Sequence, residues 1–161
     1  MTALSWKITA NDHGVIRLHA QPAHRAAKSV GANRRCQQIC QRTERQLRAY
    51  LSGRLRKFSV PVDIGGLSSF TQAVLRATTR IGYGQTRSYR WLAVRLGNPK
   101  AARAVGNALA RNPVPMLIPC HRVVRCDGRI GRFVLGAEWK KRLLDLEKSS
   151  VKTKASSRNA G

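Results

Sequence analysis

The hydrophobic pattern of this chain changes its period near Gly65-Gly66, and that change limits the folds that the chain can adopt. Ahead of these glycines, apolar residues alternate with polar ones over residues 4–20 around a turn at 11–14, which predicts a β-hairpin. Beyond them the pattern is mostly helical, with glycine and proline at the breaks. The chain has 161 residues, which suits one domain or two small ones. The sequence therefore predicts an α+β fold in which a small sheet domain precedes a helical domain.

The domain boundaries are expected where the pattern changes. The first domain, residues 1–66, would hold the hairpin, a helix that begins after Asn33, and an edge strand over 58–64. The second domain would span residues 67–147 and hold the remaining helices. The last segment, 148–161, is basic and lacks apolar periodicity, so we expect a disordered tail.

The chain is strongly basic, with 31 Lys and Arg against 7 Asp and Glu and a formal net charge of +24. Between Asp63 and Asp127 there are ten Lys or Arg residues and no carboxylate. A solvated surface usually mixes both signs, so this stretch favours a polyanionic partner, with nucleic acid first and an anionic membrane surface second. The alternative to a polyanionic partner is an organism whose proteins are generally rich in arginine. That alternative explains the high number of Lys and Arg residues better than it explains the missing acids.

No segment of the sequence looks like a targeting or membrane element. No apolar run approaches the roughly 20 residues of a membrane span, and the first residues lack the pattern of a secretory signal. We therefore expect a cytoplasmic protein, or a nuclear one in a eukaryote, whose four cysteines are thiols rather than disulfides.

Two short helices are predicted on either side of Gly97-Asn98-Pro99, with the proline at the first position of the second helix. That second helix carries a stripe of small residues, Ala102, Gly106 and Ala110, beside Arg103. A glycine inside a helix costs about 1 kcal/mol relative to alanine, so it usually marks a close approach. The approach is either packing against another helix, or entry into a minor groove about 6 Å wide with Arg103 inserted into the base stack.

Cys120 and His121 place a thiol beside an imidazole in an apolar stretch. A free thiol is mostly protonated at neutral pH, so a nucleophilic cysteine needs a base or a nearby positive charge. His121 offers the base and Arg122 the charge, although neighbours in an extended chain point apart and a water would have to bridge thiol and ring. Glu147 is one of few carboxylates that could orient the imidazole. The pair alone leaves a buried structural cysteine open.

The other cysteines have no evident chemistry. Cys36 and Cys40 lie four residues apart on the apolar side of a predicted helix, which favours core thiols over metal ligands. We find no set of zinc ligands that would complete a metal site with these cysteines among the nearby histidines His13, His19 and His24. Cys126, in an Arg-Cys-Asp-Gly turn, is expected to be exposed and oxidisable.

The stretch from Asn98 to Glu147 resembles the O6-alkylguanine-DNA alkyltransferases, also called methylated-DNA–protein-cysteine methyltransferases. The matching segments are NPKAARAVGNALARNPVPMLIPCHRVV, DGRIGRF and GAEWKKRLLDLE, and IGYGQTRSYRWLAVRLG fits the family's helix-turn-helix lead-in. The match covers about residues 58–147. The N-terminal part fits only in pattern, as a ribonuclease-H-like sheet domain.

The resemblance implies roles for single residues around the thiol. Cys120 would be the alkyl acceptor, His121 its water-mediated base, and Glu147 the partner of that base. Asn112 matches the hinge asparagine that ties the helix-turn-helix to the active-site loop.

The resemblance also implies a set of DNA contacts. Arg103 matches the arginine finger that takes the place of a flipped nucleotide, and Tyr89 matches the tyrosine that helps to rotate its phosphate. The other residues expected at the DNA are Ala102, Gly106 and Arg122.

The guanine pocket departs from the family pattern. Phe133 stands where the family usually has a tyrosine, and Val134 where it has a small hydroxyl residue. Pro115 is the third residue expected to line the pocket. Arg132, next to Phe133, adds a charge that could partly replace the lost hydrogen bonding.

The implied function is DNA repair by direct transfer of an alkyl group from guanine O6, with thymine O4 as a second candidate, to the protein's own cysteine. The base would be flipped out of the duplex first. Each molecule would act once, without cofactor or metal, as a monomer in the minor groove of alkylated double-stranded DNA, with clustering on DNA left open. Two alternatives are an alkylguanine-binding protein that transfers weakly or not at all, and a basic helix-turn-helix regulator.

Overall fold

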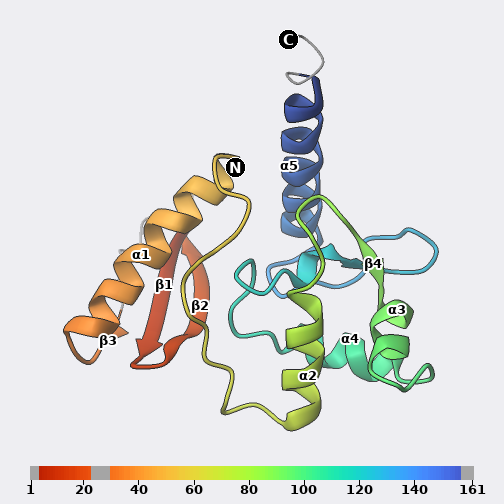
Figure 1. The fold of residues 1–161 in the computed structure, drawn as a ribbon, viewed down its shortest axis with the longest axis horizontal. Helices are drawn as coiled ribbons and strands as arrows, with labels where there is room; N and C mark the ends of the chain where they lie inside the picture. The colour runs from red at the N-terminus through yellow and green to blue at the C-terminus, as the bar shows by residue number, and fades with distance from the viewer. Residues whose placement is uncertain (1–3, 23–29, 157–161) are drawn as a thin grey trace. The chain divides into compact units, whose positions relative to one another are not determined.

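The computed structural model describes residues 4–22 and 30–156, and Figure 1 shows its elements. The chain divides into two compact units: one is Met1–Ser68 with Pro113–Leu117, and the other is Ser69–Asn112 with Ile118–Gly161. The first break lies close to the predicted boundary after residue 66. The segment Pro113–Leu117, expected in the second domain, belongs to the first unit, where the Leu18 amide donates to the Pro113 carbonyl at 2.8 Å.

The first unit is built on a three-stranded sheet in the order β2-β1-β3. Strands β1 (Leu4–Asn11) and β2 (Gly14–Pro22) form the predicted antiparallel hairpin. Strand β3 (Val30–Gly31) pairs with β1 in parallel, in a stretch that had no strand signal in the sequence. The two residues of β3 are too few to show an alternating pattern.

A bulge changes which side chains of the hairpin are buried. Ala10 pairs with Val15 while Thr9 pairs with Arg17, so Ile16 is the extra residue on β2. Val15 is fully buried and Ile16 is 36% exposed, although simple alternation along β2 places Ile16 in the core. A one-residue bulge reverses the faces beyond it, and the alternation alone does not reveal it.

Helix α1 (Arg34–Leu51) packs against the sheet (Figure 1). It begins as predicted, because the Asn33 side chain accepts a hydrogen bond from the Cys36 amide at 2.9 Å. Cys36 and Cys40 are both buried in its apolar face, as expected for core thiols. Among the described residues no group of three or more His, Cys, Asp or Glu could hold a metal ion. His24 lies outside these residues.

The expected edge strand over 58–64 is reduced to one isolated bridge between Val15 and Val62. The Val15 amide donates to the Pro61 carbonyl at 2.9 Å, and the Asp63 amide donates to the Val15 carbonyl at 3.0 Å. Pro61 has no N–H to continue the ladder, which explains why the prediction of a full strand was wrong.

The second unit is mostly helical (Figure 1), and both α2 and α3 pack against α4. A short 3-10 turn carries the cysteine and histidine of interest, and two strands form a small parallel pair beside it. Its elements are α2 (Ser69–Thr78), β4 (Arg87–Ser88), α3 (Tyr89–Arg95), α4 (Ala102–Ala110), η1 (Cys120–Arg122), β5 (Val123–Val124) and α5 (Ala137–Ser156).

Helices α2, α3 and α4 lie close to where the sequence predicts them, but the start of α4 and the buried face of α2 differ from the prediction. Ser88 caps α3 as predicted, since its hydroxyl accepts from the Trp91 amide at 3.0 Å. Helix α4 begins at Ala102 rather than at Pro99, because the residues between them form a turn. Phe70, expected in the core face of α2, is 39% exposed.

Helix α5 continues to Ser156, so the prediction of a disordered tail from residue 148 was wrong for its first part. A Cβ atom on Gly84 would lie 2.8 Å from Val151 Cγ2, which shows that Val151 packs directly over that glycine. Val151 is itself 41% exposed, so this contact lies at the edge of the packed part of α5. Residues 157–161 lie outside the described part of the chain.

No helix in the described part of the chain combines the length and the apolar character that a membrane crossing needs.

Candidate active site

Cys120 lies at the start of η1, after α4 and the loop that follows it. Its side chain is 4% exposed. The amide nitrogen Nδ2 of Asn112 donates to Cys120 Sγ at 3.1 Å and to the Ile118 carbonyl at 3.0 Å. Asn112 is itself buried and follows the C-terminal end of α4. The thiol is therefore joined to the C-terminal end of α4 through the amide side chain of Asn112.

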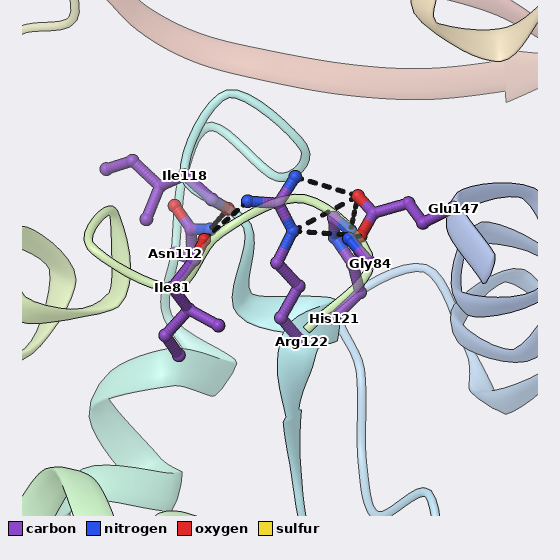
Figure 2. A network of polar contacts seen from close by, with 7 residues as sticks. All are labelled: Ile81, Gly84, Asn112, Ile118, His121, Arg122 and Glu147. Carbon is purple, nitrogen blue, oxygen red and sulfur yellow. Dashed lines mark hydrogen bonds and ion pairs between the residues drawn. The ribbon is translucent and has the colours of Figure 1, made fainter. Parts of the chain in front are cut away.

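The carboxylate of Glu147 is the centre of a buried polar network (Figure 2). His121 Nε2 lies 2.9 Å from Oε1, and the Gly84 amide donates to Oε2 at 2.8 Å. Arg122 donates through Nε to both oxygens, at 3.1 and 3.0 Å, and through Nη2 to Oε1 at 2.8 Å. The predicted partnership of His121 and Glu147 is present in the structure.

Arg122 does not lie at a DNA-facing surface, contrary to the sequence-based prediction. Its side chain is buried, and Nη1 donates to the Ile81 carbonyl at 2.6 Å (Figure 2). The guanidinium also lies over the Tyr83 ring, 5.6 Å from its centroid. The Arg122 charge neutralises Glu147. If the Arg122 side chain turned out to solvent, the buried carboxylate would be left uncompensated. Arg122 therefore supports the site from inside.

The environment fixes the resting protonation of the three reactive groups. Burial raises the pKa of Cys120 to about 11, against the hydrogen bond from Asn112, so the resting group is a thiol. Burial lowers the pKa of His121 although Glu147 opposes it, so the ring is neutral at pH 7. Burial disfavours the Glu147 anion, but hydrogen bonds from His121 and Arg122 outweigh it and lower the pKa to about 2.

These protonation states determine which nitrogen of His121 can act as a base. An ionised Glu147 only accepts hydrogen bonds, so His121 Nε2 must carry the proton in their 2.9 Å contact. The lone pair of the neutral ring is then on Nδ1. A proton from Cys120 can therefore be taken by Nδ1, while Glu147 stabilises the imidazolium that forms.

Lys140 is a functional candidate that the sequence reasoning missed. Its side chain is fully buried, and Nζ donates to the carbonyls of Val123 at 2.5 Å and Arg132 at 3.2 Å. Burial lowers its pKa to about 8, and its charge favours the Cys120 thiolate. Lys140 lies seven residues before Glu147, two helical turns away, and this spacing was the signal available in the sequence.

Tyr89 connects α3, α4 and the loop around residue 131. A Cβ atom on Gly106 would lie 3.8 Å from its ring, and one on Gly131 would lie 2.8 Å from its hydroxyl. Gly131 also has φ +72°, so a side chain there is excluded twice. Lys140 Nζ lies 3.4 Å from the Tyr89 hydroxyl. A Cβ atom on Gly106 would make only an ordinary van der Waals contact with this tyrosine, so packing against Tyr89 does not by itself require a glycine there.

The remaining predicted residues lie in three settings. Arg103 is exposed on α4 and, in the part of the chain that the structure describes, forms no ion pair, while Ala102 is half-buried on the same helix. Phe133 contacts His121 edge-on, with ring centroids 6.1 Å apart, and Val134 is 45% exposed. Pro115 is buried and belongs to the first unit.

The ionisation of Glu147 predicts how stability depends on pH. Its pKa is lowered from 4.5 to about 2 on folding, so its contribution is present above pH 4.5 and is lost as the pH falls toward 2. We expect the free energy of unfolding to decrease over this range by an amount that Glu147→Gln reduces. Urea titrations of both proteins at a series of pH values measure the difference. Parallel profiles would contradict the assigned network.

Comparison with known proteins finds one family model and several relatives that share a single name. The DNA-binding domain of 6-O-methylguanine DNA methyltransferase matches residues 69–149. Methylated-DNA–protein-cysteine methyltransferase of Methanosarcina barkeri is 43% identical over 108 residues, 67% of this chain and 68% of the relative. The protein of that name from Mycobacterium tuberculosis is 45% identical over 104 residues, 65% of this chain and 62% of its own length.

A solved structure extends the similarity to nearly the whole chain. The crystal structure of Mycobacterium tuberculosis OGT in complex with DNA has a TM-score of 0.78 at 32% identity, and the match covers 92% of each chain. Fold and site thus define a small α+β protein whose helical unit holds a buried cysteine beside a His–Glu–Arg network. The chain belongs to the methylated-DNA–protein-cysteine methyltransferase family, which confirms the resemblance seen in the sequence.

Proposed function

We propose that this protein repairs DNA by moving an alkyl group from guanine O6, with thymine O4 as a second substrate, irreversibly onto Cys120 Sγ. The observation that carries this proposal is the arrangement around the thiol: Asn112 Nδ2 lies 3.1 Å from Sγ, and His121 is bonded to a buried, ionised Glu147. A structural cysteine in a core needs neither a polarising amide nor a neighbouring base. Membership of the family supports the same chemistry.

The transfer step balances without a cofactor. The thiol proton passes through a water to His121 Nδ1, and the thiolate attacks the alkyl carbon in line with guanine O6. The S–C bond forms as the C–O bond breaks, and the guanine leaves and takes up a proton, so the net proton transfer is from thiol to guanine. The ammonium of Lys140 favours the thiolate through its charge. The thioether is stable, so each molecule acts once.

DNA binding is assigned to the α3–α4 pair as a helix-turn-helix. Helix α4 would enter the minor groove with Ala102 and Gly106 toward the DNA, Arg103 would fill the space of the flipped nucleotide, and Tyr89 would help to rotate its phosphate. The half-buried small residues and exposed Arg103 support this assignment. The hairpin, β3 and α1 would form a small ribonuclease-H-like domain.

The partner and the compartment follow from the substrate. The protein would act as a monomer on double-stranded DNA that contains alkylated guanine, in the cytoplasm or, in a eukaryote, in the nucleus. Binding isotherms on long duplexes measure whether several molecules cluster on DNA.

Intact-mass spectrometry tests the proposed transfer. After incubation with a duplex that contains O6-methylguanine, the protein should gain one methyl group, and an unmodified duplex of the same sequence should give no gain. Specific binding without a mass change would identify the protein as an alkylguanine-binding protein. Equal binding to both duplexes without a mass change would identify a basic helix-turn-helix regulator.

An arginine finger predicts a difference between substrates. Arg103→Ala should slow transfer from a methylguanine duplex far more than transfer from the free alkylguanine base, because the free base needs no flipping. Single-turnover rates under protein excess measure both reactions. Equal losses on the two substrates would remove the finger role from Arg103.

The altered pocket favours testing a second function, that of an alkylguanine-binding protein that transfers only weakly. The reason is that Phe133 offers no hydroxyl to the leaving guanine. One hydrogen bond is worth roughly 0.5–1.5 kcal/mol, and about 1.4 kcal/mol is tenfold in rate. Phe133→Tyr should therefore speed single-turnover transfer by about two- to tenfold while leaving DNA affinity nearly unchanged. A tyrosine variant that is no faster would show that Phe133 only stacks on the base, and that polar groups elsewhere assist its departure.

A further inference from the structure

Trp91 on α3 is covered by two arginine side chains. The guanidinium carbon Cζ of Arg87 lies 5.4 Å from the centre of the indole ring, and that of Arg95 lies 5.1 Å from it. Both distances are within the range of cation–π attraction. Arg87 comes from β4, directly before α3, and Arg95 is the last residue of α3. We call Arg87, Trp91 and Arg95 the arginine–tryptophan cluster.

The cluster carries positive charge that no ion pair among the described residues neutralises. Within residues 4–22 and 30–156, every ion pair involves other residues than Arg87 and Arg95. The Arg87 guanidinium donates from Nη1 to the Thr86 carbonyl at 2.8 Å. Along the chain there is no carboxylate between Asp63 and Asp127. A pair of arginines that only covered the tryptophan would not need this absence of acids.

Stacking on the indole also orders the two guanidiniums before any partner arrives. A free arginine loses considerable rotamer freedom when it binds, and a side chain already held on a ring loses less. The planar guanidinium can stack on the ring and still present N–H groups at its edge, in the geometry that suits a phosphate. The cluster therefore has the features of a preformed phosphate contact.

The position of the cluster fits DNA that is bound by α4. Helix α3 packs directly against α4 in the same compact unit, and Tyr89, at the start of α3, lies against Gly106 of α4. In a helix-turn-helix, the first helix crosses the sugar–phosphate backbone while the second occupies the groove. The cluster belongs to that first helix and the strand before it.

We propose that the arginine–tryptophan cluster binds phosphates of double-stranded DNA next to the groove occupied by α4. This inference rests on the proposed function, in which α4 carries the groove contact. It assigns to Arg87 and Arg95 the phosphate-binding role that the buried Arg122 does not have, and it makes Trp91 the residue that positions them.

The test is the salt dependence of DNA binding, measured by fluorescence anisotropy with a labelled methylguanine duplex from about 50 to 300 mM salt. The slope of log affinity against log salt is negative, and Arg87→Gln with Arg95→Gln should make it shallower by about 1.8. The same double variant should weaken binding about tenfold or more near 0.1 M salt. The matched control is Arg34→Gln with Arg45→Gln, which removes the same charge from exposed positions of α1. Equal changes in the two double variants would overturn the proposal.

A second variant separates positioning from charge. Trp91→Leu keeps both arginines, so it should weaken binding several-fold with a slope close to that of the unaltered protein. Affinity equal to that of the unaltered protein would show that the tryptophan positions nothing, and would overturn that part of the proposal. Arg87 and Trp91 are half-buried, so urea unfolding of each variant serves as the control that the fold is kept.

The same samples distinguish this inference from the proposed function. If the unaltered protein gains a methyl group but the cluster variants bind like the α1 control, the cluster assignment fails and the transfer stands. If the unaltered protein gains no methyl group while the cluster variants still lose their salt-dependent binding, the proposed transfer fails and the phosphate contact stands.

Discussion

Cys120→Ala will abolish alkyl transfer and leave the binding of alkylated duplex close to that of the unaltered protein. The thiol is the nucleophile of the proposed reaction, so its removal leaves no acceptor. Affinity for DNA comes mostly from contacts to phosphates, and a side chain as buried as Cys120 is not expected to reach one. Intact mass after incubation measures transfer, and anisotropy with the same duplex measures binding.

A control at a second cysteine sharpens this result. Cys126 is exposed, so Cys126→Ala removes the thiol that is easiest to alkylate nonspecifically. Transfer should persist in Cys126→Ala at the rate of the unaltered protein. If Cys120→Ala loses binding together with transfer, and also unfolds at lower urea, then Cys120 is a structural residue and the account fails.

His121→Gln should slow transfer by about 10²- to 10⁴-fold, the usual contribution of a positioned general base. The glutamine amide can still donate to Glu147, so the buried carboxylate keeps a hydrogen bond and its ion pair with Arg122. The thiol, with a pKa raised to about 11, then has no neutral ring to take its proton.

The pH dependence distinguishes loss of the base from loss of structure. Without the base, the rate of His121→Gln should rise with pH up to the pKa of the thiol, because transfer then depends on direct ionisation of Cys120. A variant as fast as the unaltered protein at pH 7 would exclude His121 from the proton path. Urea unfolding of the variant serves as the control for folding.

Much of the fold could be predicted because single residues determine local structure. Asn33 and Ser88 cap the helices that follow them, and the turn at 11–14 joins the predicted hairpin. What could not be predicted depends on contacts between distant segments. Two examples are the bulge that exposes Ile16 and the contact between Gly84 and Val151, which are 67 residues apart in the chain.

The candidate site divides in the same way. The family resemblance grouped Cys120, His121, Glu147 and Asn112, and the structure shows two contacts among them. Asn112 Nδ2 donates to Cys120 Sγ, and His121 Nε2 lies 2.9 Å from Glu147 Oε1. The role expected of Arg122 was wrong, because a sequence shows that a charge is present but not that it is buried against a carboxylate. Lys140 was missed for a related reason: its spacing of seven residues from Glu147 was a hint, but a lysine in a basic helix is normally solvated, whereas the structure shows this one enclosed.

The most direct test of the central claim is to locate and count the alkyl groups after reaction with excess O6-methylguanine duplex. Peptide mapping of the unaltered protein should find one methyl group per chain, on Cys120, with Cys36, Cys40 and Cys126 unmodified. A methyl group on any other cysteine, or an unmodified Cys120 in protein that binds the methylated duplex specifically, would contradict the account.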